Sequence, residues 1–149
     1  MHMPDPDKIV LSRRTEIIAA LRSIVPGEGV IAEEEELRAY ECDGLTAYRQ
    51  LPMIVVLPET TAQVSEILKY CHGEGIKIVP RGAGTSLSGG ALPLEDGITL
   101  GLGKFNRILD IDYDNRCVTA QPGVTNLAIT TAVAGDGFQI TASPQTAAT

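Results

Sequence analysis

The sequence has no excess of positive charge, no long apolar run and no paired cysteines. Its 149 residues contain 12 Lys and Arg against 19 Asp and Glu, which leaves a net charge of −7 at pH 7. This balance argues against nucleic acid and anionic membranes as partners, because both carry negative charge themselves. No stretch approaches the 18 or more apolar residues that a membrane-spanning helix needs, and the amino terminus lacks the apolar core of a signal peptide. A cytoplasmic location is therefore expected.

Cysteines are few, and repeats and linkers are absent. The three cysteines, Cys42, Cys71 and Cys117, are odd in number and form no Cys-x-x-Cys motif, so free thiols are expected. The acidic run Glu33–Glu36 has no His near it, and adjacent carboxylates on a helix point in different directions, so no metal site is predicted. Apolar residues make up 44% and charged residues 21% of the chain, which indicates one globular domain or part of a larger one.

Hydrophobic periodicity predicts helices and strands along the whole chain. In the first half it predicts helices over Lys8–Val25 and Glu33–Tyr40, a buried strand over Met53–Leu57, a helix with a capping box formed by Thr60 and Gln63, and a strand over Ile76–Val79. The last three form a β-α-β unit, for which we expect parallel strands and a right-handed crossover. In the second half it predicts strands over Gly97–Leu102, Arg107–Asp112 and Arg116–Gln121, a helix from Thr125 to Ala134, and a strand over Phe138–Thr141. This order indicates an α+β fold with a sheet of mixed direction.

A glycine-rich loop follows the strand over Ile76–Val79. Its glycines can adopt positive φ at little cost, so successive amides can turn inward and form a concavity that binds anions. The glycines are Gly82, Gly84, Gly89 and Gly90, and the hydroxyl donors among them are Thr85, Ser86 and Ser88. Arg81 adds a permanent cation where the strand ends, which is the end of a strand at which α/β sheets bind ligands. The loop therefore predicts a phosphate site, with a flexible surface loop as the alternative.

Two well-known phosphate loops do not match this one. The glycine spacing of the Walker A motif is present, but Gly90 and Ala91 stand in place of its Lys and its hydroxyl residue. The dinucleotide-binding fingerprint of Rossmann folds begins with Gly82-x-Gly84, but Leu87 stands where the third glycine belongs. Neither a P-loop NTPase nor a nicotinamide-binding Rossmann site is therefore expected.

Three ordered motifs resemble those of the FAD-linked oxidases, the family of vanillyl-alcohol oxidase and p-cresol methylhydroxylase. The motifs lie at Val55–Val64, Pro80–Ala91 and Gln121–Val124, and the stretches Ser88–Pro93 and Lys104–Ile108 resemble in particular the branch of glycolate oxidase flavoprotein subunits and D-lactate dehydrogenases. The resemblance runs from about Leu37 to the end of the sequence. It implies the first part of a PCMH-type FAD-binding domain over residues 37–149, and the helices predicted from periodicity make residues 1–36 a separate helical segment.

The resemblance also implies which residues bind FAD. In these flavoproteins the glycine-rich loop holds the FAD pyrophosphate through main-chain amides, and the third motif also faces the cofactor. The matching residues are Pro80, Arg81, Gly82, Ala83, Gly84, Thr85, Ser86, Leu87, Gly89 and Gly90 in the loop, and Pro122, Gly123 and Val124 in the third motif. Some relatives bind flavin covalently through a His in this loop. The loop here has no His, so we expect FAD to bind without a covalent link.

The implied activity is that of an FAD-dependent oxidoreductase acting on CH–OH donors. A 2-hydroxy acid, glycolate or D-lactate, is oxidised to the 2-oxo acid and its hydride passes to flavin N5; the motifs favour the glycolate oxidase flavoprotein subunit. By the same resemblance, electrons leave through a second flavin-type subunit and an iron–sulfur subunit, which would hold the protein at the inner face of the membrane. The alternatives are an alcohol, aldonolactone or ether-lipid oxidase of the same superfamily and a non-catalytic nucleotide-binding module.

The last residues depart from the family pattern. Relatives continue into a Pro-Asp-Pro-Ser-Ser-like stretch and a Thr-x-Gly-Gly that contacts the flavin, whereas Thr141–Thr149 matches only in part. We therefore expect a fragment that lacks the rest of the FAD domain, the substrate domain and the catalytic residues, so no residue is assigned as catalytic. A truncated sheet exposes an edge and an apolar face, so the fragment is expected to self-associate.

Overall fold

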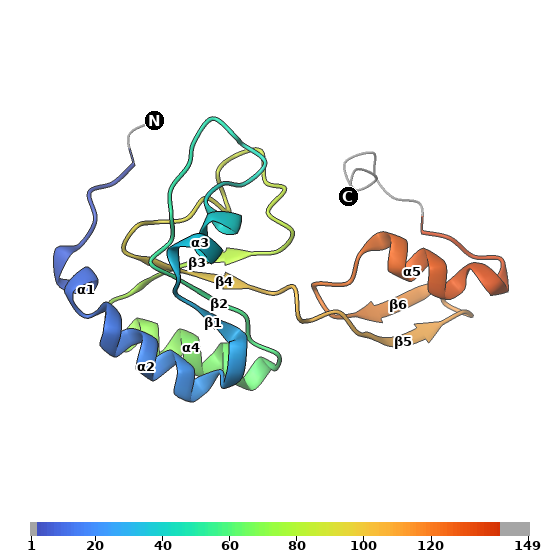
Figure 1. Ribbon diagram of the computed structural model, residues 1–149. Helices are drawn as coiled ribbons and strands as arrows, with labels where there is room; N and C mark the ends of the chain where they lie inside the picture. The colour runs from blue at the N-terminus through green and yellow to red at the C-terminus, as the bar shows by residue number, and fades with distance from the viewer. Residues whose placement is uncertain (1–2, 141–149) are drawn as a thin grey trace. The chain divides into compact units, whose positions relative to one another are not determined.

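The computed structural model describes residues 3–140, and the chain divides into two compact units, Met1–Lys104 and Phe105–Thr149. A four-stranded mixed sheet forms the centre of the first unit (Figure 1). Its strands, in spatial order, are β1 (Val30–Ile31), β2 (Ile54–Val56), β4 (Gly97–Gly101) and β3 (Lys77–Arg81). β1 is antiparallel to β2, and β4 is parallel to both β2 and β3.

The predicted β-α-β unit is present, but a further strand lies within it. β2 and β4 are buried along their whole length, which suits inner strands of a parallel sheet that are covered on both faces. The strands of the predicted unit, β2 and β3, do run parallel, but β4 lies between them. β1 was not predicted, because a strand of two residues is too short to show an alternating pattern.

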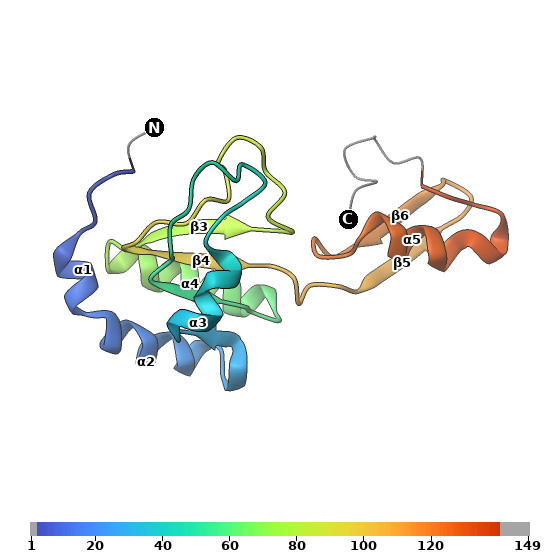
Figure 2. The same ribbon diagram turned by 45° about the horizontal axis from the view of Figure 1, so that its top comes forward.

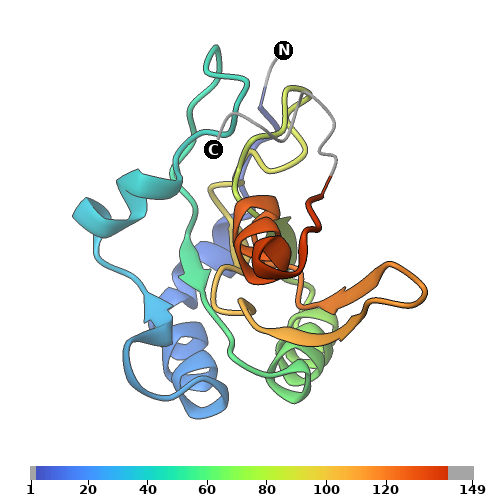
Figure 3. The same cartoon turned by 90° about the vertical axis from the view of Figure 1, so that its right-hand side faces the viewer.

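Two helices, α2 (Arg14–Ile24) and α4 (Thr61–Gly73), lie side by side on one face of this sheet (Figures 1 and 3). The residues that form the core between helices and sheet include Ile17, Leu21, Ile67 and Cys71 from the helices and Ile54, Val56, Ile98 and Leu100 from the strands. The predicted capping box of α4 is confirmed. The hydroxyl of Thr60 accepts a hydrogen bond from the amide of Gln63, and the Gln63 side chain accepts one from the amide of Thr60.

The single helix predicted over Lys8–Val25 is wrong in one respect, because the chain leaves the helical conformation at Arg13. The helix α1 (Lys8–Ser12) ends there and α2 begins at the next residue. The Arg13 side chain pairs with Glu16 at 3.1 Å and with Glu74, at the end of α4, at 2.6 Å. The break therefore lets Arg13 connect the amino-terminal helices to α4.

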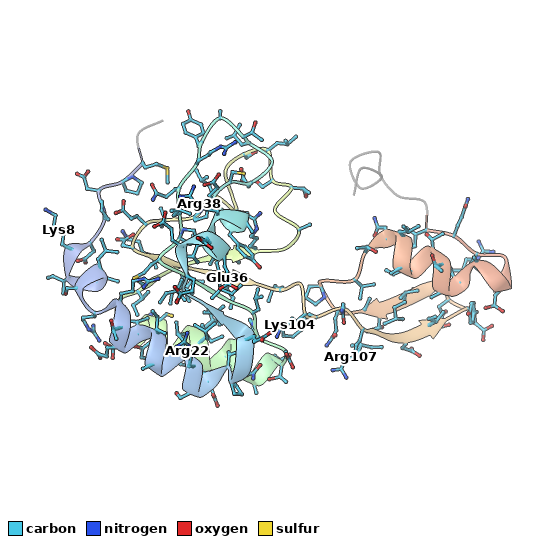
Figure 4. The ribbon with its side chains drawn as sticks, in the orientation of Figure 1. Lys8, Arg22, Glu36, Arg38, Lys104 and Arg107 are labelled. Atoms are coloured by element: carbon cyan, nitrogen blue, oxygen red, sulfur yellow. The ribbon has the colours of Figure 1, made fainter. Side chains whose placement is uncertain are left out.

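Three short helical segments complete the first unit: η1 (Gly27–Gly29), α3 (Glu34–Leu37) and η2 (Arg38–Tyr40). The short helix predicted over Glu33–Tyr40 is thus present as α3 followed by η2. Arg38 pairs with Glu34 one turn earlier at 2.9 Å, and Lys104, at the end of the unit, pairs with Glu59 at 2.7 Å (Figure 4). Both pairs are exposed and add little stability.

A buried carboxylate holds the amino-terminal arm against the sheet. Asp96, just before β4, is 3% exposed, and its Oδ2 accepts hydrogen bonds from the Asp7 amide at 2.8 Å and from Lys77 Nζ at 2.6 Å. Burial by itself raises the pKa of Asp96, but the hydrogen bonds from Lys77 and from the Asp7 amide outweigh it and hold the pKa below its ordinary value. Asp96 thus joins three segments that are distant in the sequence.

The second unit is a hairpin followed by a helix. β5 (Ile108–Asp112) and β6 (Cys117–Ala120), both of which were predicted as strands, pair with each other antiparallel, and Arg116 in the turn has a φ of 55°. Thr125 caps α5 (Asn126–Val133) as predicted, and η3 (Ala134–Asp136) follows. The strand predicted over Phe138–Thr141 is wrong for residues 138–140, which are not in a strand, and Thr141 lies outside the described residues.

The state of the cysteines and the length of the helices bear on expectations drawn from composition. Cys42, Cys71 and Cys117 are all free thiols, as expected. Within residues 3–140, no helix is both long and apolar enough to cross a bilayer.

Candidate functional site

The glycine-rich loop begins where β3 ends at Arg81 and returns to the sheet at β4, so its predicted place at the carboxyl end of a strand is confirmed. Figures 1 and 2 show the loop rising from the face of the sheet opposite α2 and α4, beside the irregular segment that joins η2 to β2. β3 is an edge strand, which explains how Pro80, with no amide hydrogen, fits within it.

Consecutive amides in the first half of the loop have no hydrogen-bond partner among the residues that the structure describes. Within the described part of the chain, none of the amides from Gly82 to Leu87 donates a hydrogen bond to another residue. Gly82, Ala83 and Thr85 are exposed, and no acidic residue occurs between Arg81 and Leu94. A row of exposed amide donors in a loop that carries no acidic side chain of its own is suited to binding an anion such as a phosphate. The residues present therefore fit the predicted pyrophosphate site.

The second half of the loop is held by its own hydrogen bonds. Ser86, predicted to add a hydroxyl donor, accepts hydrogen bonds at its Oγ from the amides of Ser88 at 3.3 Å and Gly90 at 3.1 Å. Gly84 and Gly89 have φ of 76° and 75°, a conformation that a side chain disfavours. Positive φ is thus confirmed for Gly84 and Gly89, whereas Gly82 and Gly90 do not adopt it.

Arg81, predicted as a cation at the mouth of the site, is held by internal partners. Its Nη1 donates hydrogen bonds to the carbonyls of Cys42 at 2.8 Å and Ala91 at 3.5 Å. Its Cζ lies 5.6 Å from the centre of the Tyr40 ring, within the range of a cation–π contact. The guanidinium thus ties the start of the loop to its end and to the neighbouring segment. Its contact with a ligand stays a prediction.

Five residues outside the predicted site contact the loop: Tyr40, Cys42, Asp43, Gly44 and Leu45. These residues lie between the predicted helix over Glu33–Tyr40 and the predicted strand over Met53–Leu57, or at the end of that helix, and no role was predicted for them. The Asp43-Gly44 pair is a common turn signal, which could have marked a turn here. No signal in the sequence could have shown that this turn packs against a loop about 40 residues later.

The third predicted motif lies in the second unit. The amide of Gly123 donates a hydrogen bond to the carbonyl of Phe105 at 2.7 Å, and that of Val124 to the carbonyl of Gln121 at 3.1 Å. Together with Pro122, these residues form the turn between β6 and α5. Their part in a site with the glycine-rich loop stays a prediction.

Comparison with known proteins finds one family and several relatives. Residues 52–149 match the family model described as an FAD binding domain. The glycolate oxidase subunit GlcD of Escherichia coli is 51% identical over 132 residues, which cover 89% of this chain and 25% of that protein. The mitochondrial D-2-hydroxyglutarate dehydrogenase of Bos taurus is 33% identical over 121 residues, which cover 81% of this chain and 22% of that protein. The chain thus spans about a quarter of the length of these curated relatives.

A solved structure supports the fold. The crystal structure of p-cresol methylhydroxylase with substrate bound matches with a TM-score of 0.74 at 23% sequence identity, covering 91% of this chain and 27% of that one. At this identity the likeness concerns the fold alone. It confirms the predicted α+β architecture of a PCMH-type FAD-binding domain.

Proposed function

The chain belongs to the family of FAD binding domains, and on that premise we propose that it is the FAD-binding part of a flavin-dependent 2-hydroxy acid dehydrogenase or oxidase. The observation that carries the proposal is the row of amides from Gly82 to Leu87, which have no acceptor within the described residues and lie at the carboxyl end of β3. A pyrophosphate offers several oxygen acceptors to such a row. The loop contains no His, so the FAD would be held without a covalent link.

The proposed contacts are those that the motifs indicate. They comprise Pro80, Arg81, Gly82, Ala83, Gly84, Thr85, Ser86, Leu87, Gly89 and Gly90 in the loop, with Pro122, Gly123 and Val124 in the second unit. Within this set, the main-chain amides from Gly82 to Leu87 would bind the phosphates, and the glycines among them would allow the close approach. The domain would begin near residue 37, after the helical segment formed by residues 1–36.

Glycolate is the first candidate substrate, because the 51% identical relative is named as a glycolate oxidase subunit. D-lactate is the second candidate. FAD, when bound, supplies the acceptor for the hydride that leaves the α-carbon of the 2-hydroxy acid. No residue of this chain is assigned as the base that takes the hydroxyl proton. The chain's own residues would hold and orient the cofactor.

Partners and location complete the proposal. The word "subunit" in the relative's name supports partner subunits, and we place a second flavin-type subunit and an iron–sulfur subunit among them. They would accept the electrons and hold this cytoplasmic protein at the inner face of the membrane.

The test is a visible spectrum of the purified complete protein, followed by anaerobic addition of glycolate and D-lactate in turn. We expect an oxidised-flavin spectrum that bleaches with one of the two acids. Trichloroacetic acid precipitation should release the flavin into the supernatant if it is not covalently bound.

The outcomes separate the parts of the proposal. Flavin that bleaches with neither acid would keep the FAD-binding role and reject glycolate and D-lactate as substrates. D-2-hydroxyglutarate and an alcohol would then be added in turn, and bleaching by the alcohol alone would reject the 2-hydroxy acid class. A protein that contains no flavin, even after incubation with FAD, would reject the FAD-binding role and favour a nucleotide-binding module without redox activity.

A further inference from the structure

Asp43 is a buried carboxylate that lies outside every predicted motif. It is 4% exposed, and its two oxygens accept hydrogen bonds from different parts of the chain. Oδ1 accepts from the amide of Leu45 at 2.9 Å, and Oδ2 accepts from the amide of Ala91, at the end of the glycine-rich loop, at 3.4 Å. A buried charge is costly unless it is paired or hydrogen-bonded, so the burial of Asp43 against this loop depends on these hydrogen bonds.

The turn formed by Cys42–Leu45, called here the bracing turn, holds the glycine-rich loop at its start, middle and end. At the start, the Cys42 carbonyl accepts from Arg81 at 2.8 Å. In the middle, the Leu45 amide donates to the Ser86 carbonyl at 3.1 Å. At the end, Asp43 accepts from the Ala91 amide.

Gly44 allows the bracing turn to approach the loop closely. A Cβ at this position would lie 2.9 Å from the carbonyl oxygen of Thr85 and 3.0 Å from that of Ser86. Such contacts are too short for a real Cβ, so any side chain here would push the turn and the loop apart. The fit is therefore specific to glycine.

These contacts fix the loop without using the amides that would bind a ligand. The three links engage the Arg81 side chain, the Ser86 carbonyl and the Ala91 amide, and they leave the amides from Gly82 to Leu87 without an acceptor among the described residues. A loop that is ordered before binding loses less conformational entropy when the ligand arrives. Loops rich in glycine have the most entropy to lose.

We propose that Asp43 is a positioning residue, which acts with Gly44 to hold the glycine-rich loop in the shape that binds the FAD pyrophosphate. This inference rests on the proposed function, because it needs FAD as the ligand. Asp43 itself does not contact the cofactor. Its carboxylate acts through the Ala91 and Leu45 amides.

The experiment compares Asp43→Asn with Glu41→Gln in the complete protein. Both variants remove one negative charge from the same segment, but within the described residues the Glu41 side chain pairs with Arg49 at 2.7 Å and not with the loop. In Asp43→Asn, the side-chain amide can no longer accept from both backbone donors. The dissociation constant for FAD is measured by fluorescence titration of the apoprotein, and amide hydrogen exchange is followed by mass spectrometry.

For Asp43→Asn we expect a dissociation constant raised on the order of tenfold, since several loop residues must then be ordered on binding. Exchange should become faster at Leu45 and Ala91 and stay unchanged in β4, whereas Glu41→Gln should match the wild type in both measurements. A change confined to the loop distinguishes positioning from a general loss of stability. Exchange that rises equally in β4 would overturn the inference.

Gly44→Ala is a second variant that leaves the charge unchanged. We expect the same weaker FAD binding and the same local rise in exchange. If circular dichroism shows that Asp43→Asn does not fold, Gly44→Ala alone tests whether the bracing turn positions the loop. Wild-type binding of FAD together with unchanged affinity in the folded variants would overturn the inference alone. A wild-type protein that does not bind FAD would overturn the proposed function and the inference with it.

Discussion

Replacing Asp96 with Asn should loosen the attachment of the amino-terminal arm to the sheet. The carboxylate is 3% exposed and accepts hydrogen bonds from the Asp7 amide and from Lys77 Nζ. Hydrogen bonds to charged groups contribute about 1.5–3 kcal/mol each. The Lys77 side chain is 44% exposed, so solvent screening reduces its share. We therefore expect Asp96→Asn to lower the free energy of unfolding by about 2 kcal/mol at pH 7.

The loss should depend on pH, because the folded protein holds the pKa of Asp96 below its ordinary value of 3.8. A carboxylate with a lowered pKa stabilises the folded state above its unfolded pKa and loses this contribution as the pH falls through the folded pKa. The difference between wild type and Asp96→Asn should therefore be complete at pH 7 and should shrink as the pH falls below 3.8. The variant itself has no carboxyl group at this position to titrate.

Urea unfolding followed by circular dichroism at a series of pH values measures this effect. With an m-value of about 2 kcal/mol/M, the midpoint at pH 7 should fall by about 1 M urea. Glu95→Gln is the matched control, since Glu95 is exposed and adjacent in sequence. Equal midpoints for the two variants at pH 7, or a difference that does not change with pH, would refute the reasoning. Hydrogen exchange of the Asp7 amide gives a local check, because this amide should exchange faster in Asp96→Asn.

Two further predictions concern helix α4. Thr60→Ala removes the hydroxyl that accepts from the Gln63 amide, so it should lower the free energy of unfolding by about 1 kcal/mol in urea titrations, and an unchanged midpoint would contradict this role. Cys71 is fully buried and its burial raises the pKa of its thiol to about 11, so iodoacetamide at pH 7.5 should label the exposed Cys117 and leave Cys71 unmodified until urea unfolds the protein. Mass spectrometry of the labelled peptides provides the measurement, and early labelling of Cys71 would show that α4 opens readily.

Elements defined by contacts between near neighbours in the sequence were predictable. The capping box of α4 joins residues three apart. In the hairpin turn after Asp112, the Asn115 amide donates a hydrogen bond to the Asp112 carboxylate at 2.9 Å. The position of the glycine-rich loop also follows from the order of neighbouring segments in the sequence, since the loop comes directly after an apolar strand. In each case the residues that form the contact are also those that form the pattern.

Elements that depend on distant partners could not be predicted in this way. Hydrophobic periodicity identifies β4 as a strand but carries no information on its neighbours, so its place between β2 and β3 had to come from the structure. The same holds for Arg13, whose helix break is explained by a pair with Glu74 at the far end of α4.

The sequence alone determined the type of most elements, the glycine-rich loop and the family, because helical spacing, capping residues and motifs are properties of short stretches. Only the tertiary structure decided how the loop is held. Asp43 and Ala91 are 48 positions apart, and Asp7 and Asp96 are 89 apart. Contacts over such separations form when the core between sheet and helices brings the segments together. The free energy that stabilises them comes from many residues, so no single motif in the sequence indicates them.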